Sequence, residues 1–320
     1  RFEHMPGLGV LITDEMDDAT VDGLLEQLKQ TEFNYVGQNL RPRVAAIKAA
    51  DAGKLAALVA KADQKAGAAI IIMHDDAAAL KAAAEPIKDK KPLLYAATAA
   101  NFDAVAAVAK ELDVPFAIKA DSLEALAELG QKALDGDFKE VVLDPASSSL
   151  GDVLHDQTLI RRAAVKKTFR ALGFPTIGFP CDLTDDKMLE AVYASVFVAK
   201  YAGFVILSDL DPARVLPLLY LSQNIYTDPQ RPMQMDQGVY PINDPGPDAP
   251  ILVTTNFSLT YFTVSSEVEA SKVPAWLCIM DVEGQSVLTA WAAGKFVADA
   301  IAPFLKKSGI DEKAPHKKIV

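Results

Sequence analysis

The chain has 320 residues, a formal net charge of −11 and only two cysteines, Cys181 and Cys278. This length predicts two domains rather than one small core, and the negative charge excludes a phosphate-backbone contact as the basis of binding, so we expect no nucleic-acid partner. The two distant cysteines exclude a disulfide framework and a four-thiolate cluster built from this chain alone, which indicates a reducing, cytoplasmic setting. We expect neither a membrane-spanning segment nor a signal peptide, because the apolar runs are short.

From Leu8 to about Ser222, short apolar runs alternate with longer segments that have the helical spacing of Ala and Leu. Continuous hydrophobicity of this kind is typical of parallel strands that are covered on both faces. Eight strand-then-helix units predict an α/β fold with a (β/α)8 TIM barrel over residues 1–225. The predicted strands are Leu8–Thr13, Val44–Ile47, Ala69–Met73, Pro92–Ala97, Pro115–Ile118, Glu140–Leu143, Pro175–Phe179 and Phe204–Leu207.

Several residues mark the ends of the predicted barrel helices. Asp121 and Glu124 have the spacing of a capping box, and Asp211 precedes a proline as an N-cap would. Gly203 follows a helix that is expected to end at Tyr201.

Polar residues follow several of the predicted strands, at the end of a barrel where catalytic groups lie. We interpret most of the aspartates there as helix N-caps. Lys119 has the alternative of an imine-forming role, but a salt-bridged lysine is favoured. His74 and the two aspartates after it lack a second histidine at ligand spacing, so a turn histidine is favoured over a metal ligand. The basic residues of the segment Arg161–Arg170 are interpreted as a solvated helix face.

The character of the sequence changes after the barrel. Residues 226–249 are rich in proline and predict a linker, and residues 250–320 predict a second α/β domain. Its expected strands are Ile251–Thr254 and Ala275–Met280, and Leu288–Leu305 has one apolar helical stripe. Two strands cannot form a doubly wound sheet, so we expect further strands from beyond Val320 or from another chain.

The turns after these two strands are rich in hydroxyl groups and small residues. They are expected at the carboxyl edge of the sheet, where open α/β sheets bind ligands. Such a surface suits a large, mostly apolar ring with amides on its rim, and Gly284 permits a close backbone approach. The alternative is that Ser258 and Ser286 only begin helices, and spacing alone favours this alternative.

Four segments closely resemble one known family, the large subunit of the corrinoid iron–sulfur protein of the reductive acetyl-CoA pathway. The segments are Val253–Tyr261, Ser286–Ala290, Lys91–Thr98 and Tyr226–Gln230. The resemblance implies an N-terminal [4Fe–4S] domain, a central barrel and a C-terminal flavodoxin-like, doubly wound corrinoid-binding domain. No cluster domain precedes Arg1 here, and the family continues beyond Val320, so a truncated form is expected.

The resemblance also implies a function and its partners. The family carries a methyl group on the cobalt of a corrinoid, which it receives from methyltetrahydrofolate or a methylpterin through a methyltransferase and delivers to acetyl-CoA synthase. It forms a heterodimer with a small barrel subunit and depends on a reductive activator. By matching positions, the resemblance implies that the corrinoid is bound by Thr254, Thr255, Asn256, Ser258, Leu259, Thr260, Gly284, Ser286, Val287, Leu288, Thr289 and Ala290.

The histidines bear on how the cobalt is held. A strong axial donor disfavours Co(I), so a carrier benefits from an unligated lower face. None of the four histidines occurs in the Asp-x-His-x-x-Gly pattern of cobalamin domains that supply such a donor, so we expect base-off cobalt with Thr260 on its lower side. Two alternatives remain open: a pterin-dependent methyltransferase barrel with an accessory domain, and a structural subunit that has lost the cofactor.

Overall fold

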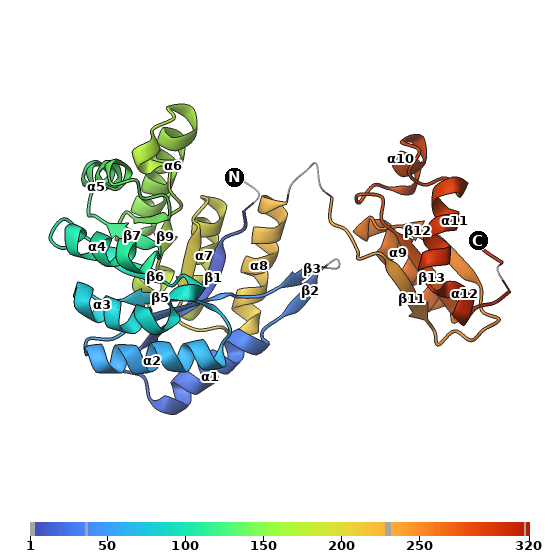
Figure 1. Ribbon diagram of the computed structural model, residues 1–320, viewed down its shortest axis with the longest axis horizontal. Helices are drawn as coiled ribbons and strands as arrows, with labels where there is room; N and C mark the ends of the chain where they lie inside the picture. The colour runs from blue at the N-terminus through green and yellow to red at the C-terminus, as the bar shows by residue number, and fades with distance from the viewer. Residues whose placement is uncertain (1–3, 36–37, 228–231, 317) are drawn as a thin grey trace. The chain divides into compact units, whose positions relative to one another are not determined.

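The computed structural model describes residues 4–35, 38–227, 232–316 and 318–320. The chain divides into two compact units. One unit comprises Arg1–Glu32 with Arg41–Tyr226, and the other comprises Phe33–Leu40 with Thr227–Val320 (Figure 1). Part of the Tyr226–Gln230 segment that supports the resemblance lies outside the described residues.

The first unit is built on eight parallel strands in the order β8-β7-β6-β5-β4-β1-β10-β9. An isolated parallel bridge between Leu143 and Thr176 links the two ends of this order, and the Leu143 amide donates to the Pro175 carbonyl over 2.8 Å. The sheet is therefore a nearly closed barrel, and all eight predicted strands are confirmed. The strands are β1 (Gly7–Thr13), β4 (Val44–Lys48), β5 (Ala69–Met73), β6 (Leu93–Ala97), β7 (Phe116–Lys119), β8 (Val141–Asp144), β9 (Ile177–Gly178) and β10 (Phe204–Leu207).

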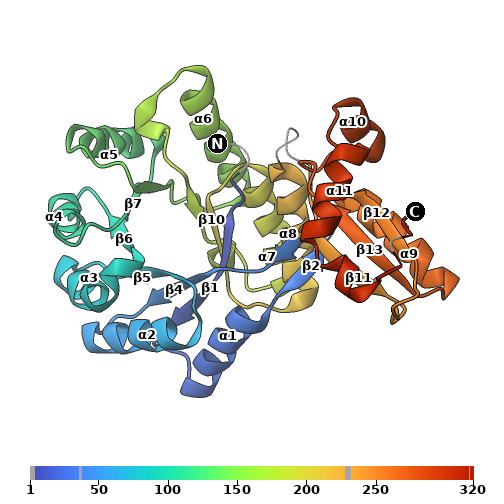
Figure 2. The same cartoon turned by 45° about the vertical axis from the view of Figure 1, so that its right-hand side comes forward.

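Helices surround this sheet on its outer side (Figure 2). Burial of both strand faces explains the unbroken apolar runs: every residue of β6 and β8 is buried. At Gly178, an added Cβ would lie 2.1 Å from the ring of Phe197, so only glycine permits this approach of helix and strand. The helices are α1 (Asp18–Gln30), α2 (Ala52–Lys65), α3 (Ala77–Ala84), α4 (Phe102–Leu112), α5 (Leu123–Asp135), α6 (Leu150–Lys166), α7 (Lys187–Ala199) and α8 (Pro212–Tyr226), with short 3-10 turns at Glu85–Lys90, Arg170–Leu172 and Pro180–Asp182.

The helix ends differ in part from the prediction. The hydroxyl of Ser122, not the Asp121 carboxylate, accepts the Ala125 amide at the start of α5, because the chain enters the helix one residue later than expected. Helix α7 ends at Ala199, two residues before Tyr201. The Asp211 carboxylate accepts the Ala213 amide over 2.8 Å, which confirms the predicted cap of α8.

The second unit contains a three-stranded sheet in the order β11-β13-β12. Its strands β12 (Ile251–Thr255) and β13 (Ala275–Met280) are parallel, and β11 (Gly238–Ile242) is antiparallel to β13. Strand β11 lies within the segment that was predicted to be a linker because of its proline content. Its backbone pairs with one edge of β13, so this part of the prediction was wrong. Two further strands, β2 (Phe33–Tyr35) and β3 (Gln38–Leu40), pair antiparallel and also group with this unit.

In the described part of this unit, four helices accompany the sheet. They are α9 (Ser258–Ser271), α10 (Val287–Ala292), α11 (Ala298–Lys307) and α12 (Ile310–Lys313). The single apolar stripe predicted over Leu288–Leu305 is divided between α10 and α11, because Gly294 has a φ of +71° and ends the first helix. At the other side of β12, the Val320 amide donates to the Ile251 carbonyl over 2.8 Å. The described sheet has three strands, so a flavodoxin-like arrangement stays a prediction.

Among the described residues, no helix combines the length and the apolar character that a membrane crossing requires.

Candidate functional site

Strands β12 and β13 end side by side. Thr255 is paired with Met280, and the next amide, that of Asn256, donates to the Met280 carbonyl over 3.0 Å. Because the strands are parallel, the two turns that follow them meet at one edge of the sheet. The structure thus brings the two predicted site segments, 254–260 and 284–290, together.

The side chain of Asn256 connects these turns. It is 2% exposed, and its Oδ1 accepts the amides of Val282 and Gly284, each over 3.0 Å. Its Nδ2 donates to Asp281 Oδ1 over 3.0 Å and to Gln234 Oε1 over 3.1 Å. With its hydrogen-bonding groups engaged inside the protein, Asn256 fixes the shape of the edge rather than presenting a polar group at the surface.

Gly284 requires the conformation that only glycine adopts freely. Its φ is +71°, and an added Cβ would lie 2.6 Å from Gln234 Cγ and 3.0 Å from the Pro232 carbonyl oxygen. The backbone of the second turn is therefore packed directly against the segment before β11.

The predicted site residues divide into a buried floor and an accessible surface. Six of them are buried, namely Thr254, Thr255, Asn256, Ser258, Gly284 and Ala290. The other six are exposed or half-exposed, namely Leu259, Thr260, Ser286, Val287, Leu288 and Thr289. In the floor, Thr255 Oγ1 and Ser258 Oγ are fully buried without a hydrogen-bond partner among the described residues. Such hydroxyls are available to a polar group that reaches them.

Large apolar side chains are exposed at this edge. Leu259 is 62% exposed, Leu288 is 74% exposed and Trp291 is 62% exposed. Leu259 lies in the first turn of α9, and the other two lie three residues apart on α10, which stands at one end of the sheet (Figure 1). Exposed apolar groups gathered in this way mark a surface for an apolar ligand or partner.

Trp291 lies within the apolar stripe predicted over Leu288–Leu305 and was not among the predicted site residues. Its spacing from Leu288 was the available signal, since residues three apart share a helix face. The stripe is split at Gly294, and the Trp291 side chain faces solvent instead. Near it, Ser286 Oγ and Thr289 Oγ1 are 3.0 Å apart and satisfy each other.

Charge at this edge is largely neutralised within the protein. Asp281 Oδ1 accepts the Asn256 amide nitrogen and the Glu283 backbone amide, and Glu283 forms an ion pair with Lys295 over 2.6 Å. The edge therefore presents apolar and hydroxyl groups more than free charge.

The described histidines are held elsewhere. Both ring nitrogens of His316 are engaged, with the Ala249 carbonyl at 2.9 Å and the Lys318 amide at 2.9 Å, at the amino end of β12. His74 likewise contacts the Ala50 carbonyl and the Asp76 amide in the barrel. Among the described residues, no group of three or more His, Cys, Asp or Glu side chains has the arrangement of a metal site.

The carboxyl end of the barrel holds a second group of polar residues. The Tyr95 hydroxyl donates to Asp144, and burial raises the pKa of both side chains above their ordinary values. Lys119 has no carboxylate within ion-pair distance among the described residues and lies 5.8 Å from the centroid of the Tyr95 ring, so the predicted salt bridge is absent. The Asp76 carboxylate caps α3, which confirms the capping interpretation there.

The fold and this edge define a class of protein: a parallel α/β barrel joined to a small α/β unit whose sheet edge offers an apolar and hydroxyl-bearing surface. Residues 1–320 match the model of the CO dehydrogenase/acetyl-CoA synthase delta subunit family, and the chain belongs to that family.

Three relatives show how far the similarity extends. The chain is 38% identical over 323 residues to the corrinoid/iron-sulfur protein large subunit of Moorella thermoacetica, with 100% of this chain and 72% of that protein covered. It is 32% identical to the acetyl-CoA decarbonylase/synthase complex subunit gamma of Archaeoglobus fulgidus, with 100% of this chain and 70% of that subunit covered. The acetyl-CoA decarbonylase/synthase complex subunit gamma of Methanosarcina acetivorans is 35% identical, with 94% of this chain and 67% of that subunit covered. Among solved structures, Mycobacterium tuberculosis Rv1207 has a TM-score of 0.49 at 12% identity and matches 71% of this chain and 95% of its own.

Proposed function

We propose that this chain is a corrinoid-binding methyl carrier of the acetyl-CoA pathway. The family membership and the words corrinoid and acetyl-CoA in the names of its relatives support this function. The single observation that carries it is the sheet edge after β12 and β13, where exposed apolar side chains accompany a floor whose Thr255 and Ser258 hydroxyls have no hydrogen-bond partner in the described part of the chain. A corrin ring is a large apolar disc with amides on its rim, and such a surface suits it.

The residues of the edge have separate tasks in this proposal. Leu259, Leu288 and Trp291 cover the apolar face of the ring and exclude water from it. The buried hydroxyls of Thr255 and Ser258 form the polar floor beneath these side chains, and Asn256 keeps the two turns in register. As part of this proposal, we assign a flavodoxin-like form to this unit.

The cofactor, when bound, supplies a cobalt atom that accepts and releases a methyl group. The chain's own contribution is to leave the lower side of the ring without a nitrogen donor: no histidine lies in the segments 254–260 and 284–290, and Thr260 is the neighbour that we assign to that side. A corrinoid held here would meet no histidine nitrogen from these two segments, so we propose the base-off state for its cobalt. With two cysteines in the chain, the [4Fe–4S] cluster that restores the reduced state is supplied from outside these residues.

The partners follow from the same function. A methyltetrahydrofolate or methylpterin methyltransferase supplies the methyl group, and acetyl-CoA synthase receives it. The proposed complex also contains the small barrel subunit as the heterodimer partner and a reductive activator. Membership of an acetyl-CoA decarbonylase/synthase complex in the names of the gamma relatives supports this assignment.

Reconstitution with hydroxocobalamin tests the proposal. After removal of free cobalamin, we expect bound cobalt in a ratio near one per chain, an absorption spectrum of the base-off form, and no nitrogen splitting in the electron paramagnetic resonance spectrum of the Co(II) form. A colourless protein contradicts the proposal and supports a structural subunit. Methyl transfer to free cobalamin by this chain alone supports the barrel methyltransferase instead.

Variants at the apolar surface sharpen the test. Leu288→Asp places a charge at a position that is 74% exposed, so we expect folding to persist and cobalamin retention to fall. Leu154→Asp is the matched control, since Leu154 is 46% exposed on α6 of the barrel. Equal retention by both variants would place the cofactor elsewhere.

A further inference from the structure

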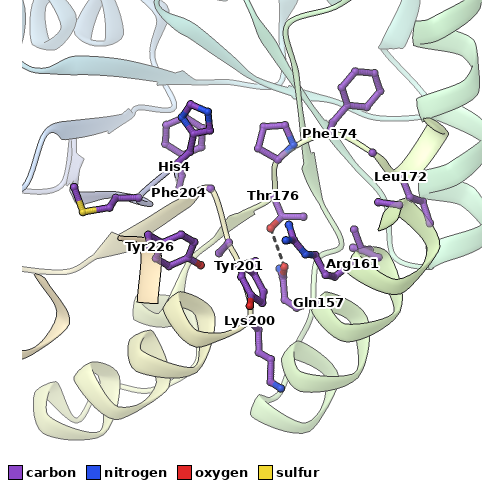
Figure 3. Close-up of a pocket in the computed structure, with 17 residues that line it drawn as sticks. His4, Gln157, Arg161, Leu172, Phe174, Thr176, Lys200, Tyr201, Phe204 and Tyr226 are labelled. Carbon is purple, nitrogen blue, oxygen red and sulfur yellow. Dashed lines mark hydrogen bonds between the residues drawn. The ribbon is translucent and has the colours of Figure 1, made fainter. Parts of the chain in front are cut away.

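A pocket at the amino end of the barrel is not used by the proposed function. It has a volume of about 380 Å³ and is lined by residues that precede β1, β9 and β10 together with residues of α6 and α8 (Figure 3). This volume lies within the range of small-molecule sites in proteins. All of the lining residues belong to the barrel unit, so the pocket is complete within it.

Gln157 places an unused donor at this pocket. Its side chain is 2% exposed, and its Oε1 accepts the Thr176 hydroxyl over 2.8 Å. The amide nitrogen Nε2 is buried and has no hydrogen-bond partner among the described residues. A buried donor without an acceptor is unfavourable, so an acceptor in the pocket would stabilise it.

Arg161 adds a positive charge from the next turn of α6. Its guanidinium carbon lies 4.2 Å from the centroid of the Tyr201 ring, and Figure 3 shows it beside Gln157 and Thr176. Among the described residues, no carboxylate lies within ion-pair distance of this guanidinium. The face that the sequence indicated as solvated therefore directs one of its arginines toward the pocket.

The charge of the lining contrasts with that of the protein. The described lining residues include Arg161, Lys200 and His4 and contain no Asp or Glu, although the whole chain has a net charge of −11. A pocket without acidic groups in such an acidic chain favours a negatively charged ligand. In Figure 3 the side chain of Lys200 points away from Gln157 and Thr176, whereas Arg161 lies beside them.

Aromatic rings form much of the remaining wall. The rings of Tyr201 and Tyr226 meet edge to face with centroids 5.7 Å apart, and Phe174 and Phe204 also line the pocket. The Tyr226 hydroxyl donates to the Val198 carbonyl over 2.7 Å, which holds that ring in place. A ligand here meets two hydrogen-bond donors and the flat apolar surfaces of aromatic rings.

We propose that this pocket binds an organic carboxylate with an aromatic or planar apolar body. The carboxylate would accept hydrogen bonds from the Arg161 guanidinium and from Gln157 Nε2, and the body would pack against Tyr201 and Tyr226. Because groups at the amino end of a barrel are remote from the edge where barrel enzymes react, the site binds a ligand without transforming it.

Phenylacetate and its neutral isostere phenylacetamide are the probes. In a titration of the full chain followed by ligand-observed NMR, we expect saturable binding of phenylacetate at millimolar concentration and about tenfold weaker binding of phenylacetamide. This comparison uses the wild-type protein and so does not depend on the folding of a variant. Absence of phenylacetate binding, or equal affinity for both probes, overturns the proposal.

Two variants locate the site. Arg161→Gln should weaken phenylacetate binding about tenfold, because a charge-assisted hydrogen bond is lost. Arg162→Gln is the matched control, since Arg162 is the exposed neighbour on the same helix and does not line the pocket. An equal loss in both variants refutes the assignment to this pocket. Phenyl phosphate is the third probe: tighter binding of phenyl phosphate than of phenylacetate overturns the choice of a carboxylate.

Discussion

The Asn256 side-chain oxygen accepts the backbone amide of Gly284 over 3.0 Å, although the two residues are 28 positions apart. One side chain thereby ties together the two turns that the proposed function requires. The turn after β13 depends on this contact, because a second amide, that of Val282, has the same acceptor.

Removal of this acceptor should loosen the second turn. In Asn256→Ala, the amides of Val282 and Gly284 lose their partner while buried, at a cost of about 1–3 kcal/mol for each group left unsatisfied. Hydrogen–deuterium exchange of residues 281–286 should accelerate, and cobalamin retention should decrease. Asn224→Ala, at an exposed position of α8, is the control, and unchanged exchange in the Asn256 variant would contradict the role of this side chain.

Gly284→Ala should destabilise the second unit through both its backbone and its contacts. The φ of +71° costs a β-carbon residue about 1 kcal/mol or more, and the added Cβ meets Gln234 at 2.6 Å. Gly294→Ala separates the two causes, because Gly294 has the same φ and no atom within 4 Å of the added Cβ. In urea unfolding monitored by Trp fluorescence, the wild type should be the most stable, Gly294→Ala less stable and Gly284→Ala the least stable. A Gly284 variant as stable as the Gly294 variant would show that the contact of the added Cβ with Gln234 does not lower the stability of the unit.

Asp144 should make the barrel less stable as the pH rises. Burial raises its pKa above the ordinary value of 3.8, so the folded state binds a proton that the unfolded state has released. The stabilising contribution of the protonated group is present below pH 3.8 and is lost as the pH rises through the folded-state pKa. In Asp144→Asn this pH dependence of stability disappears. The amide has one acceptor oxygen, so it weakens the hydrogen bond either from the Tyr95 hydroxyl or from the Ala146 amide.

The measurement is the melting temperature of both proteins at a series of pH values upward from about 4. Other titrating groups affect the two proteins equally, so the difference between them isolates Asp144. The melting temperature of the variant minus that of the wild type should increase as the pH rises. A constant difference would show that Asp144 is as ionised in the folded barrel as in the unfolded chain.

Cys278 should be unreactive in the native protein. It is fully buried in β13, and burial raises the pKa of its thiol to about 11, so little thiolate is present near pH 8. Iodoacetamide should label it at least about 100-fold more slowly than a free cysteine, and labelling in urea should proceed at the ordinary rate. Peptide mass spectrometry distinguishes it from Cys181, and rapid native labelling of Cys278 would contradict the described packing of this strand.

The barrel was predictable because local pattern and tertiary role coincide in it. An apolar run such as Leu93–Ala97 is buried on both faces of a parallel strand, and a polar turn and the helix α4 follow it. The same reasoning failed for Gly238–Ile242, since the evidence for that strand is the free edge of β13, which becomes visible only in the fold.

The sequence by itself determined the barrel strands, the absence of a histidine from the two turns, and the resemblance that the family match confirms. The tertiary structure decided which residues of those turns face solvent: Asn256 and Ser258 are buried, while Leu288 and Trp291 are exposed. It also joined Gln157 and Arg161 in one pocket with Thr176 and Tyr226. Burial and hydrogen-bond partners depend on contacts between segments far apart in the chain, and the local spacing of residues does not predict these contacts.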